Sequence, residues 1–137
     1  MTAISLRVPL VPPSVNHYKL PIERRSRLGR TCLGFRVTPE GKAFKAAIAI
    51  AAKGQSIAPA TQRERDKIRY YLAVTIVLGP GQRGDGDNFW KCIADGLVEA
   101  GVIHSDARVK VWHLELDDED RTNPRTEIFA SVMNGEK

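Results

Sequence analysis

Residues 84–101 read GDGDNFWKCIADGLVEAG, and the pattern of this stretch changes partway along it. The first part is rich in glycine and acid, which favours a tight loop because glycine adopts backbone angles that other residues avoid. The second part carries apolar side chains at spacings of three and four, which predicts a helix with one buried face that ends at Gly101. The stretch therefore predicts an acidic loop that leads directly into a helix.

The loop carries two aspartates, Asp85 and Asp87, that stand one residue apart. Like charges this close raise each other's pKa unless a cation sits between them, and Mg²⁺ is the expected cation because it prefers carboxylate oxygens. The structural alternative is that Asp87 or Asn88 caps the helix by accepting hydrogen bonds from its first amides. Lys91 and Asp95 would then form an exposed ion pair worth about 0.3–0.5 kcal/mol. The spacing alone favours neither a metal site nor a cap.

Strands are predicted on both sides of this loop and helix. Residues 69–78 are apolar at successive positions, which is typical of a central strand buried on both faces. A later strand is predicted at residues 109–114, and Asp106 stands just before it. A side chain at the entry of a strand has little conformational freedom, so Asp106 joins Asp85 and Asp87 as a candidate active-site acid.

The remaining pattern gives the order of the elements. Residues 4–10 and 126–132 alternate between apolar and polar side chains, which predicts a first and a last strand. Residues 38–40 (Thr-Pro-Glu) form a helix start, because a hydroxyl, a proline and an acid are favoured at those positions. Residues 55–66 are interpreted as a featureless linker, and the acidic run at 115–120 as a solvated hairpin tip. We therefore predict an α+β fold in the order β-α-β-α-β-β, with two helices on one face of a mainly antiparallel or mixed sheet.

Composition limits the classes of protein to which the chain can belong. With 137 residues, of which 42% are hydrophobic, residues 1–137 can bury a core as a single domain. The chain has no apolar run of about 20 residues that would span a membrane. Its first residues lack a basic start followed by an apolar core, so we do not expect secretion. Cys32 and Cys92 lie far apart and outside any CxxC pair, which favours reduced thiols. These features predict a cytoplasmic protein without a membrane partner.

The net charge of +5 is divided unevenly along the chain. Residues 1–84 hold 15 Lys and Arg against 4 Asp and Glu, whereas residues 85–137 hold 6 against 12. A basic half beside an acidic half favours a polyanionic partner together with a metal-binding pocket, and nucleic acid fits that partner best.

A basic segment at about residues 19–36 concentrates the positive charge. It contains one acid, Glu23, and is interrupted by glycines. One alternative is a solvated loop, and the other is an arm or hairpin that binds phosphates, which the single sign of the charge favours. The candidate DNA-binding residues are Lys19, Arg24, Arg25, Arg27, Arg30 and, next to the acidic loop, Arg83.

Together these motifs resemble the RusA-type Holliday-junction resolvases, a family found in bacterial prophages and in phages. The resemblance runs through residues 12–18 (PPSVNHY), 37–41 (VTPEG), 85–91 (DGDNFWK), 95–97 (DGL) and 106–109 (DARV). It implies a homodimeric, Mg²⁺-dependent endodeoxyribonuclease, with Mn²⁺ as a substitute ion. Such an enzyme resolves four-way DNA by paired cuts in recombination and repair, in the cytoplasm of a bacterial host.

The resemblance also implies roles for individual residues. Asp85, Asp87 and Asp106 match the metal-binding aspartates of the family, and Lys91 matches its catalytic lysine. Two further polar residues fall within the matching motifs and are expected to support the site, namely Asn16 and Asn88.

The chain departs from the family pattern at two positions. Arg83 stands alone before the acidic loop, where members often carry more basic residues, and this weakens the expected grip on DNA near the cut. Ser105 stands where many members carry a second acid, which alters the expected affinity for the metal.

Two other functions stay open from the residues alone. A structure-specific DNA-binding protein without catalytic activity would use the acids only as caps and ion pairs. A metal-dependent phosphohydrolase that acts on small nucleotides is disfavoured, because such a substrate needs no basic segment and the chain has no phosphate-cradling loop.

Overall fold

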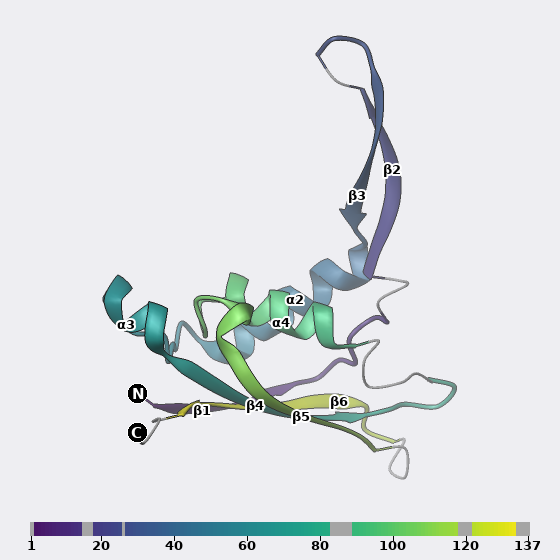
Figure 1. Cartoon of the computed structure of the whole chain (residues 1–137). Helices are drawn as coiled ribbons and strands as arrows, with labels where there is room; N and C mark the ends of the chain where they lie inside the picture. The colour runs from purple at the N-terminus through teal and green to yellow at the C-terminus, as the bar shows by residue number, and fades with distance from the viewer. Residues whose placement is uncertain (1, 15–17, 26, 83–88, 118–121, 134–137) are drawn as a thin grey trace.

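A four-stranded sheet forms one layer of the molecule (Figure 1). The computed structural model describes residues 2–14, 18–25, 27–82, 89–117 and 122–133. The sheet contains, in spatial order, β1 (Ala3–Val8), β6 (Arg125–Met133), β4 (Arg69–Val77) and β5 (Val109–Asp117). β6 pairs antiparallel with both β1 and β4, whereas β5 pairs parallel with β4. The prediction of an α+β fold with a mixed sheet is confirmed, as is the central position of the strand now labelled β4.

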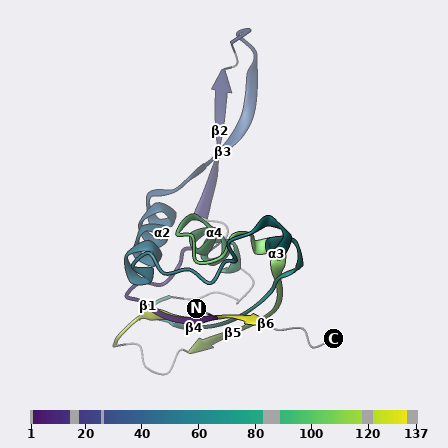
Figure 2. The ribbon, with the colours of Figure 1, turned by 90° about the vertical axis from the view of Figure 1, so that its left-hand side faces the viewer.

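Two helices cover one face of this sheet, as Figures 1 and 2 show. They are α2 (Pro39–Ala52) and α4 (Trp90–Glu99). α2 begins where predicted, because the hydroxyl of Thr38 caps it by accepting a hydrogen bond of 3.2 Å from the amide of Gly41. The two helices approach closely, since a Cβ atom at Gly96 of α4 would lie 2.6 Å from Cδ1 of Ile48. Among the described helices, none is long and apolar enough to cross a membrane.

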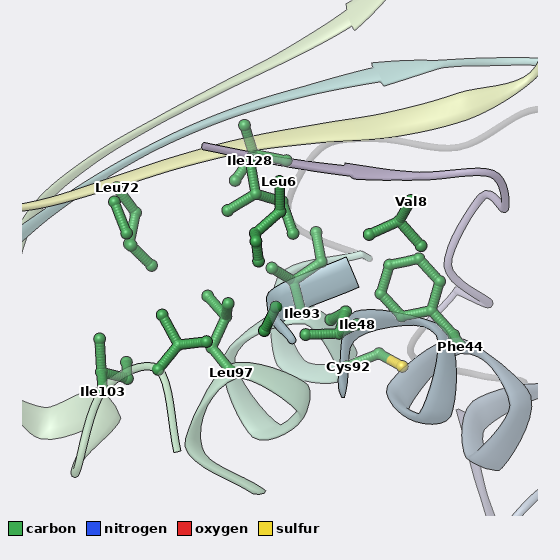
Figure 3. Close-up of a cluster of buried hydrophobic side chains, with 14 of the residues drawn as sticks. Leu6, Val8, Phe44, Ile48, Leu72, Cys92, Ile93, Leu97, Ile103 and Ile128 are labelled. Carbon is green, nitrogen blue, oxygen red and sulfur yellow. The ribbon is translucent and has the colours of Figure 1, made fainter. Parts of the chain in front are cut away.

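The hydrophobic core lies between the sheet and these two helices (Figure 3). Both layers contribute side chains that are at most 5% exposed, including Leu6, Val8, Phe44, Ile48, Leu72, Ile93, Leu97 and Ile128. Burial of such a side chain contributes roughly 1.5–3 kcal/mol. Because one face of α4 is fixed in this core, Lys91 and Asp95 are left on the face that is not fully buried.

A stacked pair of indole rings fixes the start of α4 against β5. Trp90, the first residue of α4, stacks on Trp112 of β5 with ring centroids 4.2 Å apart and an angle of 17° between the planes. Aromatic pairs of this kind contribute about 0.5–1.5 kcal/mol beyond the burial of their area. The stack therefore sets the position of the next residue, Lys91, relative to the segment that leads into β5.

The basic segment forms a separate two-stranded sheet. β2 (Lys19–Arg25) pairs antiparallel with β3 (Thr31–Val37), and the hairpin projects away from the sheet and the helices (Figures 1 and 2). Gly29 in the connecting turn has a φ of +78°, which glycine adopts without strain. Two apolar side chains of the hairpin, Leu28 and Phe35, are 83% and 66% exposed.

Two connections differ from the prediction. Residues 55–66 are not a featureless linker, because a short helix, α3 (Gln62–Lys67), begins within them. β5 and β6 lie on opposite sides of β4, so the acidic run at 115–120 is not the tip of a hairpin between neighbouring strands. Its first three residues belong to β5, and the others lie outside the described residues. The predicted order β-α-β-α-β-β therefore lacks α3 and the two strands of the β2–β3 hairpin.

Candidate active site

Lys91 and Asp106 are the predicted catalytic residues that the structure describes, and they lie close together. Nζ of Lys91 is 4.0 Å from Oδ2 of Asp106 and 3.1 Å from Oδ1 of Asp95. The ammonium group therefore stands between two carboxylates, one on its own helix and one just before β5. The side chains of Lys91 and Asp106 are 49% and 44% exposed, so both charges are accessible to a ligand.

Five of the predicted residues lie outside the described residues, namely Asn16, Arg83, Asp85, Asp87 and Asn88. The described part of α4 begins at Trp90, and its N-cap position is Phe89, which makes no side-chain capping bond. Asp87 and Asn88 lie outside the described residues, so their capping of the helix stays an untested alternative.

Within the described part of the chain, no group of three or more His, Cys, Asp and Glu side chains is arranged to hold a metal ion. Asp106 is the described member of the predicted ligand set, and metal binding stays a prediction. The chemistry of that set fits Mg²⁺, because all three members are carboxylates and Mg²⁺ prefers oxygen ligands.

A short turn of 3₁₀ helix, η2 (Asp106–Arg108), holds Asp106 at the entry to β5. The hydroxyl of Ser105 caps the turn by accepting a hydrogen bond of 3.2 Å from the amide of Ala107. Nε of Arg108 donates to the carbonyl of Ile68 at 2.8 Å, which ties the turn to the residue before β4. These bonds fix Asp106 on both sides, and they give Ser105 a local capping role in place of the second acid of the family pattern.

Asp95 connects Lys91 to the interior of the protein. Its Oδ2 accepts a hydrogen bond of 2.7 Å from the hydroxyl of Tyr18, a residue that is 1% exposed. Burial, reinforced by this hydrogen bond, raises the pKa of Tyr18, so the phenol keeps its proton and remains a donor. The ion pair between Lys91 and Asp95, which the structural alternative named as an exposed pair, is present, but Asp95 is only 20% exposed and is not a simple surface partner.

Sequence reasoning did not assign a role to Tyr18. Two signals were available, since Tyr18 ends the PPSVNHY motif and Asp95 stands four residues after Lys91. Neither signal reveals that the tyrosine and the aspartate meet, because they are separated by 77 positions in the chain.

A hollow of about 270 Å³ opens beside these side chains, and its walls include Lys91, Asp95, His104 and Asp106. Nδ1 of His104 and the hydroxyl of Tyr70 form a hydrogen bond of 2.8 Å, and the tyrosine is fully buried. His104 is thus anchored in the wall of the hollow. The volume is below the range of about 300–1,000 Å³ that is typical of sites for whole small molecules.

The basic hairpin begins at this site. Tyr18, the hydrogen-bond partner of Asp95, immediately precedes β2. The ammonium groups of Lys19 and Lys45 each lie 5.6 Å from the centre of the Tyr18 ring, within the range of a cation–π contact. Three further candidate DNA-binding residues, Arg25, Arg27 and Arg30, are exposed along the hairpin, and the backbone of Arg24 pairs opposite Cys32.

Comparison with known proteins identifies one family. The family model described as endodeoxyribonuclease RusA matches residues 20–130, which run from β2 into β6 and include Lys91, Asp95 and Asp106. No individual curated protein matches the chain.

Proposed function

The chain belongs to the RusA family of endodeoxyribonucleases, and we propose from this that it resolves Holliday junctions by Mg²⁺-dependent, paired hydrolysis of phosphodiester bonds. One arrangement in the structure carries the proposal. An accessible ammonium group, that of Lys91, stands 4.0 Å from the carboxylate of Asp106 at the base of a cationic hairpin. A strand of DNA held by such a hairpin reaches a site that offers both positive charge and a ligand for a cation.

The reaction requires an attacking water and a means to stabilise the negative charge that develops on the phosphate. Mg²⁺ bound by Asp85, Asp87 and Asp106 would supply an activated water and neutralise part of that charge. Lys91 places a fixed positive charge beside Asp106, where it stabilises the transition state more than the ground state. Lys19, Arg24, Arg25, Arg27, Arg30 and Arg83 bind phosphates and position the DNA without reading its sequence.

The substrate also constrains the assembly. A four-way junction has two-fold symmetry, and a homodimer presents two copies of the site for paired cuts.

The enzyme acts on chromosomal or phage DNA in the bacterial cytoplasm, during recombination and repair. Asn16 and Asn88 support the site, and Mn²⁺ replaces Mg²⁺ as an oxygen-bound ion.

The test of this function uses labelled four-way, flap and linear DNA with and without Mg²⁺. We expect the four-way junction to be cut when Mg²⁺ is present and the linear duplex to stay intact.

Asp87→Asn and Asp106→Asn keep the shape of each side chain but remove the charge that a hard cation needs. We expect cleavage to fall by about 10²-fold or more. Junction binding should persist or tighten, because a negative charge that faces phosphates is lost.

Asp66→Asn is the matched control, since Asp66 is an exposed acid on α3 whose bond to Gln62 stays within that helix. It should leave cleavage unchanged. Normal Mg²⁺-dependent cleavage by Asp87→Asn would end the catalytic assignment. Tight junction binding by the wild-type protein, with no cleavage of any DNA, would instead support the non-catalytic DNA-binding function.

A further inference from the structure

Asp95 has no role in the function proposed above, yet it lies between Lys91 and a buried tyrosine. We propose that Asp95 is a positioning residue that holds the ammonium group of Lys91 beside Asp106, and that Tyr18 fixes Asp95 in turn. This inference rests on the proposed function, because it assigns a role within the same site.

The two oxygens of Asp95 contact different partners. Oδ1 lies 3.1 Å from Nζ of Lys91, and Oδ2 accepts the hydrogen bond of 2.7 Å from Tyr18. A carboxylate that is held at both oxygens cannot rotate without breaking one contact. Its orientation is therefore fixed, and so is the direction from which it attracts the lysine.

Tyr18 is itself held by three contacts, two with the start of α2 and one with α4. Its carbonyl accepts a hydrogen bond of 2.8 Å from the amide of Thr38, the residue that caps α2. Its ring packs against Gly41 in the first turn of α2, where a Cβ atom would lie 2.6 Å from Cδ1 of the ring. The hydroxyl then reaches Asp95 on α4. The position of Lys91 is thus tied to the packing of α2 against α4 and not only to its own flexible side chain.

An ordinary surface ion pair does not account for this arrangement. Pairs at a spacing of four on a helix usually join two exposed side chains and contribute little to stability. Here Asp95 is 20% exposed and takes its second hydrogen bond from a phenol that is 1% exposed. A lysine side chain that is 49% exposed would otherwise sample many rotamers, and only some of them place the ammonium group beside Asp106.

Asp95 and Asp106 are also used differently. Both oxygens of Asp95 are engaged by donors from the protein, whereas among the described residues the nearest ion-pair partner of Asp106 is Lys91, at 4.0 Å. Asp106 therefore keeps its oxygens available for a ligand, and Asp95 keeps the lysine in place. Groups that orient a catalytic or ligating side chain typically change activity by about 10–100-fold when they are removed.

The first test compares Asp95→Asn with the wild-type protein. Asparagine keeps the size of the side chain and can still accept the hydrogen bond from Tyr18, but it has no charge to attract Lys91. We expect single-turnover cleavage of a four-way junction to fall by about 10–100-fold. The affinity for the junction without metal and the concentration of Mg²⁺ at half-maximal rate should both stay unchanged. A large rise in that Mg²⁺ concentration would identify Asp95 as a metal ligand and overturn the proposal.

Asp66→Asn is the matched control for charge, because it makes the same chemical change at an exposed acid of α3, whose bond to Gln62 stays within that helix. The Asp66→Asn variant should cleave at the wild-type rate. An equal loss of activity in Asp66→Asn and Asp95→Asn would show that the net charge of the protein matters, and the specific role of Asp95 would be lost.

A double-mutant cycle tests whether Asp95 acts through Lys91. If it does, Asp95→Asn should have little further effect in a Lys91→Ala background, since the group that it positions is already absent. A full, multiplicative loss in the double variant would contradict the proposal.

Tyr18→Phe keeps the buried ring and removes only the hydroxyl, so it should reduce cleavage in the same direction as Asp95→Asn and by a smaller factor.

A spectroscopic measurement keeps the inference separate from the proposed function. In ¹⁵N-labelled protein at low temperature and mildly acidic pH, a held ammonium group exchanges its protons slowly enough to be observed. We expect a signal that Lys91→Arg abolishes and that Asp95→Asn weakens or removes. If the wild-type protein cuts no junction, the proposed function is wrong, but this signal still tests whether Asp95 positions Lys91. A Lys91 signal that is unchanged in Asp95→Asn would overturn the inference, even in an active nuclease.

Discussion

Cys92 follows Lys91 directly in the chain but lies on the buried face of α4, where its side chain is 1% exposed. Burial raises the pKa of its thiol to about 12, and the Lys45 ammonium opposes this shift only in part. The thiolate is the reactive form of cysteine, so Cys92 is protonated and unreactive at neutral pH despite its place beside the site. Its role is to fill the core between α2 and α4.

The same physics predicts how stability depends on pH. Burial raises the pKa of Cys92 and, with the hydrogen bond to Asp95, that of Tyr18, so the folded protein holds these protons more tightly than the unfolded chain. The contribution of each group to the free energy of unfolding is therefore fully present below its unfolded pKa. It is lost progressively as the pH rises from the unfolded pKa through the raised pKa of the folded protein. We expect urea denaturation to show a free energy of unfolding that falls from about pH 9 upward, by up to about 1.4 kcal/mol per pH unit for each group.

Cys92→Ala supplies the control, because it removes one of these two groups. Between pH 9 and pH 10 its free energy of unfolding should fall less steeply than that of the wild-type protein. A wild-type stability that stays constant or increases across this interval would contradict the assignment of these raised pKa values.

The spacing of residues along the chain predicted contacts within one helix, but it predicted no contact between separate elements. The pair of Lys91 and Asp95 follows from a separation of four positions, which places both side chains on one helix face. The bond between Tyr18 and Asp95 depends on how α2 and the start of β2 pack against α4, and no periodicity in the sequence encodes that distance. The third partner, Asp106, was singled out by its place at the entry of a strand and by its motif, but neither signal predicts its distance from Lys91.

The β2–β3 hairpin is a two-stranded sheet that projects away from the rest of the fold (Figure 1). Two strands without further support are only marginally stable in water, and this hairpin exposes Leu28 and Phe35 beside its basic side chains. Phosphate contacts along the hairpin would stabilise it and anchor the DNA at the same time.

Replacing Arg24, Arg25, Arg27 and Arg30 with alanine should therefore weaken junction binding. Each lost phosphate contact should also reduce the slope of log affinity against log salt concentration by about 0.9. Affinity is measured by fluorescence anisotropy over a series of salt concentrations. The control variant carries Arg63→Ala and Lys67→Ala on α3, two exposed cations at the far end of the molecule from the hairpin (Figure 1). Equal effects of the two variants on affinity and slope would show that net charge, and not the hairpin, binds the DNA.

The helices differ in how far the sequence could predict them. α2 has a capping threonine, a proline at its first position and an apolar face, and each of these signals is local. α3 has no buried residue, and its sequence accordingly shows no apolar periodicity. Its start was nonetheless encoded in Thr61-x-x-Glu64, because the hydroxyl of Thr61 accepts a bond from the amide of Glu64 and also contacts its carboxylate. A capping signal without an apolar run is easily taken for a linker.

At the scale of the whole molecule, the order of strands in the sheet could not be predicted from pattern. β4 and β5 are joined through α4, which allows them to lie parallel, whereas β6 returns on the other side of β4. Each strand could be located from its own residues. Their neighbours depend on which faces the helices cover, and this is a property of the assembled core.

The whole-molecule prediction concerns assembly. We expect sedimentation equilibrium at micromolar concentration to give twice the mass of the chain, because paired cuts in a junction with two-fold symmetry require two coupled sites. The bound form should contain two chains for each four-way junction. The control is the Asp106→Asn variant, which should assemble like the wild-type protein, since its change lies in the site. A monomer both in solution and on the junction would contradict the proposed mode of action.

The stack between α4 and β5 has an optical consequence. The chain has two tryptophans, and both of them, Trp90 and Trp112, form that stack. The tryptophan fluorescence of the protein therefore originates at one place, directly beside Lys91. Stacked indoles also couple their electronic transitions, so the same pair gives the near-ultraviolet circular dichroism a contribution that depends on the angle between the rings. A ligand that shifts α4 against β5 changes both signals, which makes the unlabelled protein its own reporter of events at the site.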